Sequence, residues 1–260
     1  MSQDPSRQAG RRANRAPRRQ RVSVVQVFAE LLLTAGVLIG LFVVWQVWIN
    51  NEISGASQYN VAEDLSNEWS LGPGATSAPA EAPAEEVEPV VAKAPAADEK
   101  FANLIVPRFG KDFIRPIAEG VGFSVLNNMS LGMGHYPSSQ MPGEIGNFAL
   151  ASHRSAYGGA FHTIHHLRVG DAIFVETEDG WYKYIYRNTE YVKVSGVGVI
   201  LPVPQDAGAE ATERIITLTT CNPFYSSAER IIAYGVFDSW YPRADGPPKE
   251  IASLVAKADD

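Results

Sequence analysis

The first regular pattern along the chain is an apolar stretch near the N-terminus. Residues 22 to 50 read VSVVQVFAELLLTAGVLIGLFVVWQVWIN, and no charged residue occurs from Leu31 to Ile49. About 20 consecutive apolar residues are enough to cross the hydrocarbon core of a bilayer as a helix. Trp45 and Trp48 lie at the far end of the stretch, where indole rings favour the headgroup region. We therefore predict a transmembrane signal-anchor helix over residues 22–50.

The sequence that follows is polar and shows no period. Residues 51–100 are rich in Ala, Pro and Glu, as in GPGATSAPAEAPAEEVEPVVAKAPAADEK. Such a composition buries too little apolar surface to fold, and its like charges favour an extended chain. We expect a disordered linker here, with a short helical piece in NVAEDLSNEW at its start.

From Phe101 onward, short alternating segments predict β-strands. FANLIVPRFGKDFIRPI contains two strand-like runs separated by Gly110, and GNFALASH, ERIITLTTC and ERIIAYGVFDSWY each add one. GDAIFVETEDGWYKYIYRNTEYVKV predicts a hairpin, because Asp179-Gly180 is a strong turn pair between two alternating runs. Many short strands with few helices indicate an antiparallel barrel or sandwich over residues 101–243.

Two other segments differ from these strands. Phe161, Ile164 and Leu167 recur at helical spacing and predict a short helix. Residues 244–260 show neither the alternation of a strand nor the spacing of a helix, and we expect them to form a flexible C-terminal tail.

Charge adds an orientation to the membrane span. Residues 1–21 carry seven arginines and one aspartate, although the chain as a whole has a formal net charge of -7. A basic block can bind nucleic acid, but arginines placed before an apolar span indicate a cytoplasmic N-terminus. We expect a cytoplasmic tail over residues 1–21, no nucleic-acid partner, and a folded domain outside the cytoplasm. The alternative is a cleaved signal peptide, which usually has a shorter apolar run followed by a small-residue cleavage site.

The chain contains a single cysteine, Cys221. Exported domains use cysteine mainly in disulfide pairs, so an unpaired one is a buried small side chain, an intermolecular link or a reactive thiol. In RIITLTTC, alternation places Ile216 and Leu218 on the core face and Cys221 on the other face, at the end of the strand. Alternation alone leaves the structural and the reactive cysteine equally open.

A nucleophilic thiol needs a base or a cation beside it, because a free thiol has a pKa of about 8.5. His153 ends a strand and precedes a Gly-Gly loop, where functional sites are commonly built. His135 lies in a loop, and His162, His165 and His166 lie on or beside the short helix, where exposed histidines are usual. Adjacent histidines without spaced carboxylates are a weak metal signal, and we expect neither a metal nor a cofactor.

Arg230 begins the strand that follows the cysteine loop. If the two strands pair antiparallel, Arg230 lies beside Cys221. A guanidinium there can lower the pKa of the thiol, bind a substrate or stabilise an oxyanion. An ordinary surface ion pair with Glu229 is the alternative.

Together these residues resemble the sortase family. TLTTC resembles its TLxTC signature, ASHR its strand-end histidine motif, SAERIIAYG its arginine-bearing strand, and FHTIHHLRVGDAIFVET its F-x-x-L-x-x-G-D segment. The resemblance covers roughly residues 101–243, and HYPSSQMPGEIGNFALASHR and TTCNPFYSSAER are most similar to class E. It implies a mainly β fold: an eight-stranded sortase-type β-barrel with short helices, a transmembrane helix and a disordered linker.

The resemblance also implies a membrane-anchored cysteine transpeptidase. Cys221 would cleave a C-terminal LAxTG- or LPxTG-type sorting signal between Thr and Gly, with His153 as general acid and base and Arg230 stabilising the oxyanion. Tyr136 would help to select Ala over Pro in the signal, and Thr220 would shape the pocket. The implied partners are exported proteins that carry the signal and a cell-wall precursor (lipid II) that supplies the amine. The implied location is the cell membrane, single-pass, with the catalytic domain outside the cell.

Four alternatives remain at this point. A cysteine peptidase would pass the acyl group to water. A pilin-polymerising sortase usually carries a DPW-like lid motif and often a second apolar span, and neither occurs in this sequence. An L,D-transpeptidase keeps its histidine and cysteine close together in an S-H-G-C type motif, unlike His153 and Cys221. A membrane-tethered binding domain would not need the cysteine.

Overall fold

The computed structural model describes residues 23–45, 49–72, 74–81 and 87–255. The predicted basic tail over residues 1–21, Trp48 and the last five residues of the predicted C-terminal tail lie outside the described residues. The chain divides into two compact units, Met1–Val43 and Val44–Asp260.

Helix α1, Val24–Val44, makes up nearly all of the described part of the first unit. None of its 21 residues is buried. Among the described residues it is the one helix that is long enough and apolar enough to cross a membrane. It lies within the span predicted over residues 22–50 and suggests that the protein is anchored in a membrane.

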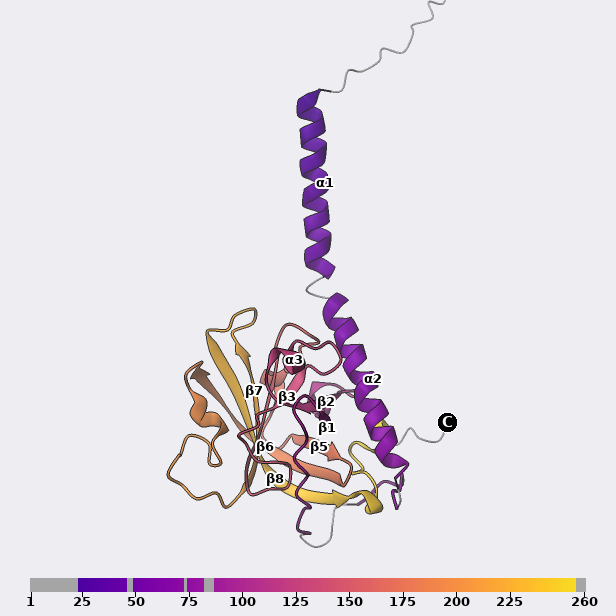
Figure 1. Ribbon diagram of the computed structural model, residues 1–260, viewed down its shortest axis with the longest axis vertical. Coiled ribbons are helices and arrows are strands. Elements are labelled where there is room, and N and C mark those ends of the chain that lie inside the picture. The colour runs from indigo at the N-terminus through magenta and orange to yellow at the C-terminus, as the bar shows by residue number, and fades with distance from the viewer. Residues whose placement is uncertain (1–22, 46–48, 73, 82–86, 256–260) are drawn as a thin grey trace, which may run out of the picture. The chain divides into compact units, whose positions relative to one another are not determined.

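The second unit is built around a closed β-barrel (Figure 1). Eight strands close it in the order β1-β2-β3-β4-β7-β8-β6-β5 within the part of the chain that the structure describes. Neighbouring strands are antiparallel except for β2 with β3 and β4 with β7. The strands are β1 (Lys100–Ile105), β2 (Ile114–Glu119), β3 (Met133–His135), β4 (Gly146–Ser152), β5 (Ala172–Thr177), β6 (Gly180–Lys193), β7 (Arg214–Asn222) and β8 (Glu229–Pro242). The predicted mainly β, eight-stranded barrel is therefore confirmed.

Helical segments are few and mostly short in this unit. The α-helices are α2 (Asn50–Ser70), α3 (Phe123–Leu126) and α4 (Ala252–Val255), and the 3-10 helices are η2 (Pro107–Phe109), η3 (Ile164–His166), η4 (Val197–Ile200) and η5 (Arg243–Asp245). Figure 1 shows α2 running along the outside of the barrel, beside β1 and β2.

Two local predictions can be compared directly with the structure. The β5–β6 hairpin forms, but its two-residue loop is Glu178-Asp179, so the turn begins one residue before the expected Asp179-Gly180 pair. Gly180 opens β6 at φ +149°, and a Cβ there would meet the carbonyl oxygen of Tyr241 at 2.1 Å. Only glycine fits that approach of two backbones. The predicted short helix forms as the 3-10 turn Ile164–His166, and the three apolar side chains that predicted it are buried.

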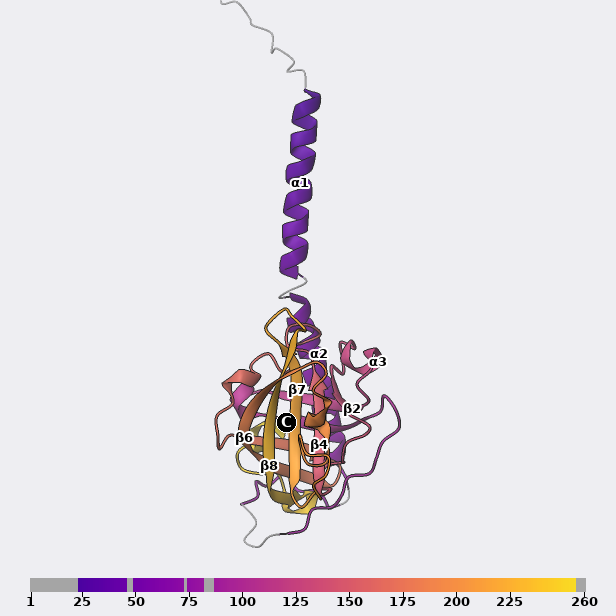
Figure 2. The same ribbon diagram turned by 90° about the vertical axis from the view of Figure 1, so that its left-hand side faces the viewer.

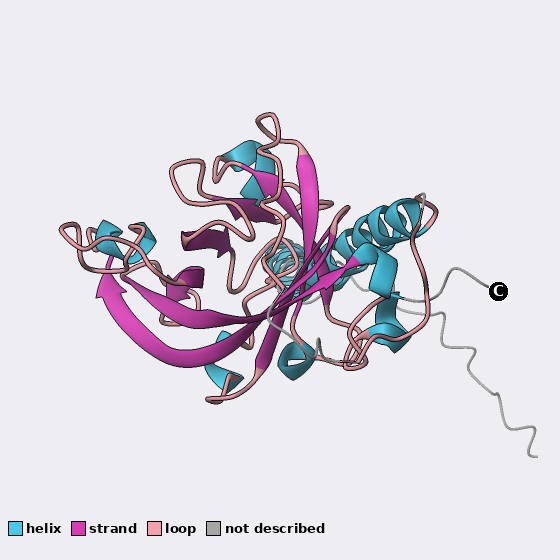
Figure 3. Cartoon of the chain, turned by 90° about the horizontal axis from the view of Figure 1, so that it is seen from below, coloured by secondary structure: helices cyan, strands magenta, loops and turns pink. Residues whose placement is uncertain are grey.

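The main hydrophobic core fills the interior of the barrel, around which the strands curve (Figure 3). Leu104 of β1 and Ile173 and Val175 of β5 face this interior. Their neighbours Ile105 and Phe174 belong to a second cluster, on the outside of the barrel, and are also fully buried. β1 and β5 are apolar on both faces because a further layer covers the barrel wall.

Helix α2 is part of that outer layer. The short helical piece expected in NVAEDLSNEW is confirmed as part of it, whereas the expectation of a disordered linker over residues 51–100 is wrong for residues 51–70. The side chains that α2 buries recur at helical spacing: Ser54, Gln58, Ala62, Leu65 and Ser66. Most of them are polar or small. The helix therefore docks through hydrogen bonds and close packing, without the apolar stripe that would have shown its full length in the sequence.

The coil after α2 and the C-terminal segment also belong to the folded unit. The amide of Ala92 donates to the carbonyl of Pro142, and the amide of Ala80 donates to the carbonyl of Pro247. In the predicted flexible tail over residues 244–260, Ile251 and Val255 are buried in the outer apolar cluster. That tail has too few apolar residues to show a period, so its docking is visible only in three dimensions.

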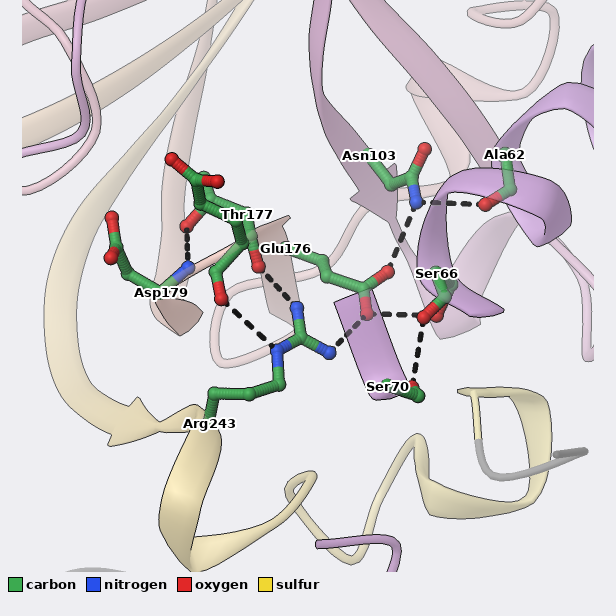
Figure 4. A network of polar contacts seen from close by, with 9 residues as sticks. Ala62, Ser66, Ser70, Asn103, Glu176, Thr177, Asp179 and Arg243 are labelled. Carbon is green, nitrogen blue, oxygen red and sulfur yellow. Dashed lines mark hydrogen bonds and ion pairs between the residues drawn. The ribbon is translucent and has the colours of Figure 1, made fainter. Parts of the chain in front are cut away.

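A buried ion pair joins these layers (Figure 4). The Glu176 carboxylate on β5 is fully buried and accepts hydrogen bonds from Ser66 Oγ at 2.8 Å, Asn103 Nδ2 at 3.0 Å and Arg243 Nη1 at 3.1 Å. The Arg243 guanidinium lies 4.0 Å from the centroid of the Trp181 ring. The network connects α2, β1 and β5 to the segment after β8, and it fixes α2 on the barrel.

We expect Arg243→Met to lower the free energy of unfolding by about 3 to 5 kcal/mol, because it leaves the Glu176 charge buried without its cation. Denaturant unfolding of the full-length chain in detergent micelles, followed by tryptophan fluorescence, measures the change. Arg187→Met is the matched control, since Arg187 is exposed on β6. Equal stability of the two variants would contradict a structural role for the ion pair.

Candidate active site

Three strands bring the predicted site residues to one end of the barrel. Strands β4 and β7 run parallel, with Ala151 opposite Thr219, so two residues further on the two chains reach His153 and Cys221. Strands β7 and β8 are antiparallel, with Cys221 opposite Arg230. The predicted pairing of cysteine and arginine is therefore confirmed. Figure 2 shows β7 between its two partners β4 and β8.

Cys221 and His153 line one pocket. The rest of its wall comes from the start of α2, the loop after His153 and the loop after Cys221: Asn50, Asn51, Arg154, Ser155, Ala156, Tyr157, Tyr225, Ser226 and Ser227. The Cys221 thiol is unpaired and partly exposed. A partly exposed thiol in a pocket that also holds an imidazole favours the reactive cysteine over the structural one.

The His153 imidazole has one fixed partner and one free edge. Its Nε2 lies 2.8 Å from Asn127 Oδ1, and the Tyr157 ring lies beside it with the centroids 5.3 Å apart. Because the Asn127 oxygen accepts, Nε2 carries the proton of the neutral ring and Nδ1 remains for proton exchange. Burial lowers the pKa of His153 below its ordinary value, so the neutral form predominates at pH 7.

Arg154 is a residue of the pocket wall to which the sequence analysis gave no role. Its buried guanidinium donates from Nη1 to Asn222 Oδ1 at 2.5 Å and lies 4.9 Å from the centroid of the Phe224 ring. It therefore ties the chain after His153 to the chain after Cys221. Its position directly after the histidine, before the glycines of the loop, was the only signal in the sequence.

Arg230 is oriented by backbone carbonyls. Its Nη1 donates to the carbonyl oxygens of Ser227 at 3.1 Å and Glu229 at 2.9 Å. The Glu229 carboxylate instead accepts from Asn222 Nδ2. No Arg230–Glu229 ion pair occurs among the described residues, so the alternative of an ordinary surface ion pair with Glu229 is not what the structure shows.

Tyr136 and Thr220, the two predicted pocket-shaping residues, both contact the β4–β7 pair. The Tyr136 hydroxyl lies 3.2 Å from Oγ1 of Thr219. The Thr219 hydroxyl in turn donates to the carbonyl of Leu150. Thr220 is buried, and its hydroxyl donates to the carbonyl of Ser152 at 2.7 Å, one residue before His153. In this structure Thr220 fastens the end of β4 to β7 with its hydroxyl.

The other histidines lie outside the pocket. His135 is buried, with Nδ1 2.7 Å from Glu119 Oε2 and Nε2 3.1 Å from the carbonyl of Gln140, and these contacts give it a structural role. His162 packs against the Phe224 ring, and His165 lies 3.5 Å from an Arg154 nitrogen. Within the described residues, no three His, Cys, Asp or Glu side chains form a group that could hold a metal ion.

Comparison with known proteins shows the family to which the chain belongs. The Sortase domain model matches residues 104–238. Sortase SrtE1 of Streptomyces coelicolor is 34% identical over 261 residues, which cover 95% of this chain and 67% of that protein. The SrtA sortase from Actinomyces oris has 37% identity and a TM-score of 0.59, covering 63% of this chain and 93% of that one.

A structure of sortase E1 from Streptomyces coelicolor, with a tripeptide in its active site, has 37% identity and a TM-score of 0.55, and the match covers 61% of this chain and 99% of that one. The region that the family model matches contains β4, β7 and the first part of β8, and so includes His153, Cys221 and Arg230. The class E members among the similar proteins agree with the class that the sequence motifs resemble. The chain is therefore a member of the sortase family of cysteine transpeptidases, of class E.

Proposed function

We propose that this transpeptidase cleaves a C-terminal LAxTG- or LPxTG-type sorting signal between Thr and Gly and joins the new acyl group to the amine of a lipid-linked cell-wall precursor. The observation that carries the proposal is the position of the chain's single cysteine in one pocket with His153, at the ends of two parallel strands. A peptide substrate is in keeping with the tripeptide held by sortase E1 from Streptomyces coelicolor.

The proposed reaction has two acyl-transfer steps. In the first, the Cys221 thiol gives its proton to Nδ1 of His153 and its sulfur attacks the Thr carbonyl carbon. The Thr–Gly C–N bond then breaks, and His153 donates that proton to the departing glycine amine. In the second, the acceptor amine attacks the thioester, gives a proton to His153, and the Cys221 sulfur leaves. Arg230 stabilises the negative charge on the carbonyl oxygen in each tetrahedral intermediate.

The proposed location follows from the sequence on either side of α1. The seven arginines that precede the span support a cytoplasmic N-terminus and a barrel outside the cell. There the enzyme meets exported proteins and a membrane-linked acceptor. The lack of a DPW-like motif in the sequence favours a housekeeping role in wall anchoring over pilin polymerisation.

Tyr136 is the residue that we propose to discriminate between Ala and Pro in the signal. It comes directly after β3, and its hydroxyl contacts β7 two residues before Cys221. An aromatic ring held this close to the nucleophile limits the width of the substrate groove. Thr220 acts on the same groove by fixing the backbone at His153.

The test of the proposed function uses the full-length chain in detergent micelles. It is incubated with paired LAxTG and LPxTG peptides and an amine acceptor, and the products are followed by mass spectrometry. We expect a product in which the acceptor is joined to the Thr carbonyl. Hydrolysis in the presence of excess acceptor would favour a peptidase. Absence of any cleavage would overturn the assignment of this signal.

The buried position of His153 predicts the pH dependence of the reaction. Burial disfavours the imidazolium and lowers the pKa, so the neutral ring persists to a lower pH than for an exposed histidine. We therefore expect the acid limb of the kcat/KM profile below about pH 6.5, the ordinary value for histidine. Measurements between pH 5 and 9 locate that limb. A limb above 6.5 would contradict the assignment to a desolvated His153.

Replacing Arg230 with alanine is expected to lower kcat/KM by about 10² to 10³-fold, the usual effect of removing one oxyanion donor. The groups that Arg230 contacts, the backbone carbonyls of Ser227 and Glu229, are hydrogen-bond acceptors, so they cannot replace it as a donor. Arg187→Ala removes an exposed arginine from β6, and we expect it to stay within twofold of the wild type. Activity of Arg230→Ala equal to that of this control would remove Arg230 from the mechanism.

A further inference from the structure

The first turn of α2 lies at the active-site pocket. Asn50 and Asn51, its first two residues, line the pocket together with His153 and Cys221. Further along the helix, Ser66 is held by the buried Glu176 carboxylate. The helix is thus fixed on the barrel wall near one end and reaches the pocket with the other.

Two amide side chains of α2 hold the loop that follows His153. Asn51 Nδ2 donates to the carbonyl of Ser155 at 3.0 Å, and Asn51 Oδ1 accepts from the amide of Gly158 at 3.4 Å. Gln58 is fully buried, and its Nε2 donates to the carbonyl of Tyr157 at 2.8 Å. Three hydrogen bonds from one helix therefore define the path of this loop.

The loop needs external support because of its own backbone. Tyr157 has φ +49°, in the left-handed region, which costs a residue other than glycine on the order of 1 kcal/mol. The next residue, Gly158, has φ +84°, and a Cβ there would meet Gln58 Oε1 at 2.8 Å. The glycine therefore makes room for Gln58, and Gln58 holds the carbonyl of the strained residue.

The strained residue is also the one that packs against the imidazole. The Tyr157 ring lies beside His153, with the centroids 5.3 Å apart. On the other side, His153 is hydrogen-bonded to Asn127. Helix α2 also contacts the segment that contains Asn127, because Ser57 Oγ lies 2.9 Å from Ser130 Oγ. Both neighbours of the imidazole thus belong to segments that α2 holds.

From these contacts we propose that α2 is an integral part of the active site and that Asn51 and Gln58 are positioning residues for His153. They fix the loop over residues 154–159, which presses the Tyr157 ring against the imidazole. The proposal rests on the proposed catalytic role of His153. It gives the segment between the membrane span and the barrel a function in catalysis in addition to that of a tether.

The test compares Asn51→Ala and Gln58→Ala with Asn60→Ala in the full-length chain in detergent micelles. Asn60 is exposed on the same helix, so Asn60→Ala is the matched control. For the peptide reaction we expect kcat to fall about tenfold with KM within twofold, because the imidazole is misplaced while the substrate groove is kept. Asn51→Asp, which still accepts from Gly158 but cannot donate to Ser155, is expected to fall between Asn51→Ala and the wild type.

A second readout needs no substrate. Cys221 is the only thiol in the chain, so its alkylation by iodoacetamide reports on the site alone. We expect the pH profile of alkylation for Asn51→Ala to shift towards that of His153→Ala, whereas Asn60→Ala keeps the wild-type profile. If wild-type protein alkylates normally but no peptide reacts, the proposed substrate is wrong and this readout still decides the role of Asn51.

Two outcomes would overturn the proposal. One is wild-type kcat and a wild-type alkylation profile in both Asn51→Ala and Gln58→Ala. The other is a lower melting temperature in these variants together with an unchanged alkylation profile. That result would mean that α2 only stabilises the fold. Asn51 is partly exposed, so its variant remains informative if Gln58→Ala, with a buried side chain removed, fails to fold.

Discussion

Replacing Cys221 with alanine is expected to lower turnover of the sorting-signal peptide by at least about 10⁴-fold, to below detection, while the barrel stays folded. Removing the nucleophile of an enzyme that works through a covalent intermediate removes the pathway itself, as the loss of comparable size in serine proteases illustrates. No second thiol exists in the chain to take over. Product formation from paired peptides and an amine, followed by mass spectrometry, measures the loss.

The fold is expected to survive because Cys221 is partly exposed and lies at the end of β7, where alanine removes one sulfur and few contacts. Circular dichroism and the unfolding midpoint check this directly. Ser253→Ala, an exposed position on α4, controls for handling of the variants and should match the wild type. Retention of more than a few per cent of activity by Cys221→Ala would exclude Cys221 as the nucleophile.

The same experiment separates the enzymatic alternatives. A cysteine peptidase would also lose activity with Cys221→Ala, but the wild type would give only the hydrolysed peptide when the amine is in excess. An L,D-transpeptidase would leave the Thr–Gly bond intact. The distribution of products, rather than the loss of activity, therefore decides the class of acceptor.

Alternation along the strands predicted much of the barrel. In β7, Ile216 and Leu218 face the core as expected, and this register carries Cys221 to the strand end on the opposite face. The strand signal was strong because each strand buries at least one face in a single apolar interior. Pairing of β7 with β8 then followed from the short connection between them, and with it the approach of Arg230 to Cys221.

The contacts beyond the barrel were less predictable, for a physical reason. Helix α2 docks through buried polar side chains such as Gln58 and Ser66, whose hydrogen-bond partners Tyr157 and Glu176 lie far away in the sequence. Such contacts leave no apolar period in the sequence of the helix. The same holds for the surroundings of His153. Arg154 and Asn127 act through polar contacts to distant segments, which only the folded chain defines.

The polar contacts around His153 prepare it for two opposite tasks. It must hold a proton when the glycine amine leaves and must be free of one when the acceptor amine arrives. Asn127 fixes the Nε2 proton, so the exchangeable proton is confined to Nδ1, and burial keeps the ring largely neutral at pH 7. The fixed tautomer confines proton exchange to one nitrogen, and the lowered pKa makes the protonated ring a stronger acid towards the departing amine.

We therefore expect His153→Ala to lower kcat by about 10³ to 10⁴-fold, at the upper end of the range for general acid–base catalysis, because the same group serves both steps. His166→Ala is the matched control: His166 is exposed on η3, outside the pocket, and its loss should leave kcat within twofold. Single-turnover measurements resolve the two steps, and we expect both acylation and transfer to the amine to slow down. A loss confined to transfer would mean that another group protonates the leaving glycine amine, and activity equal to the control would exclude His153 from proton transfer altogether.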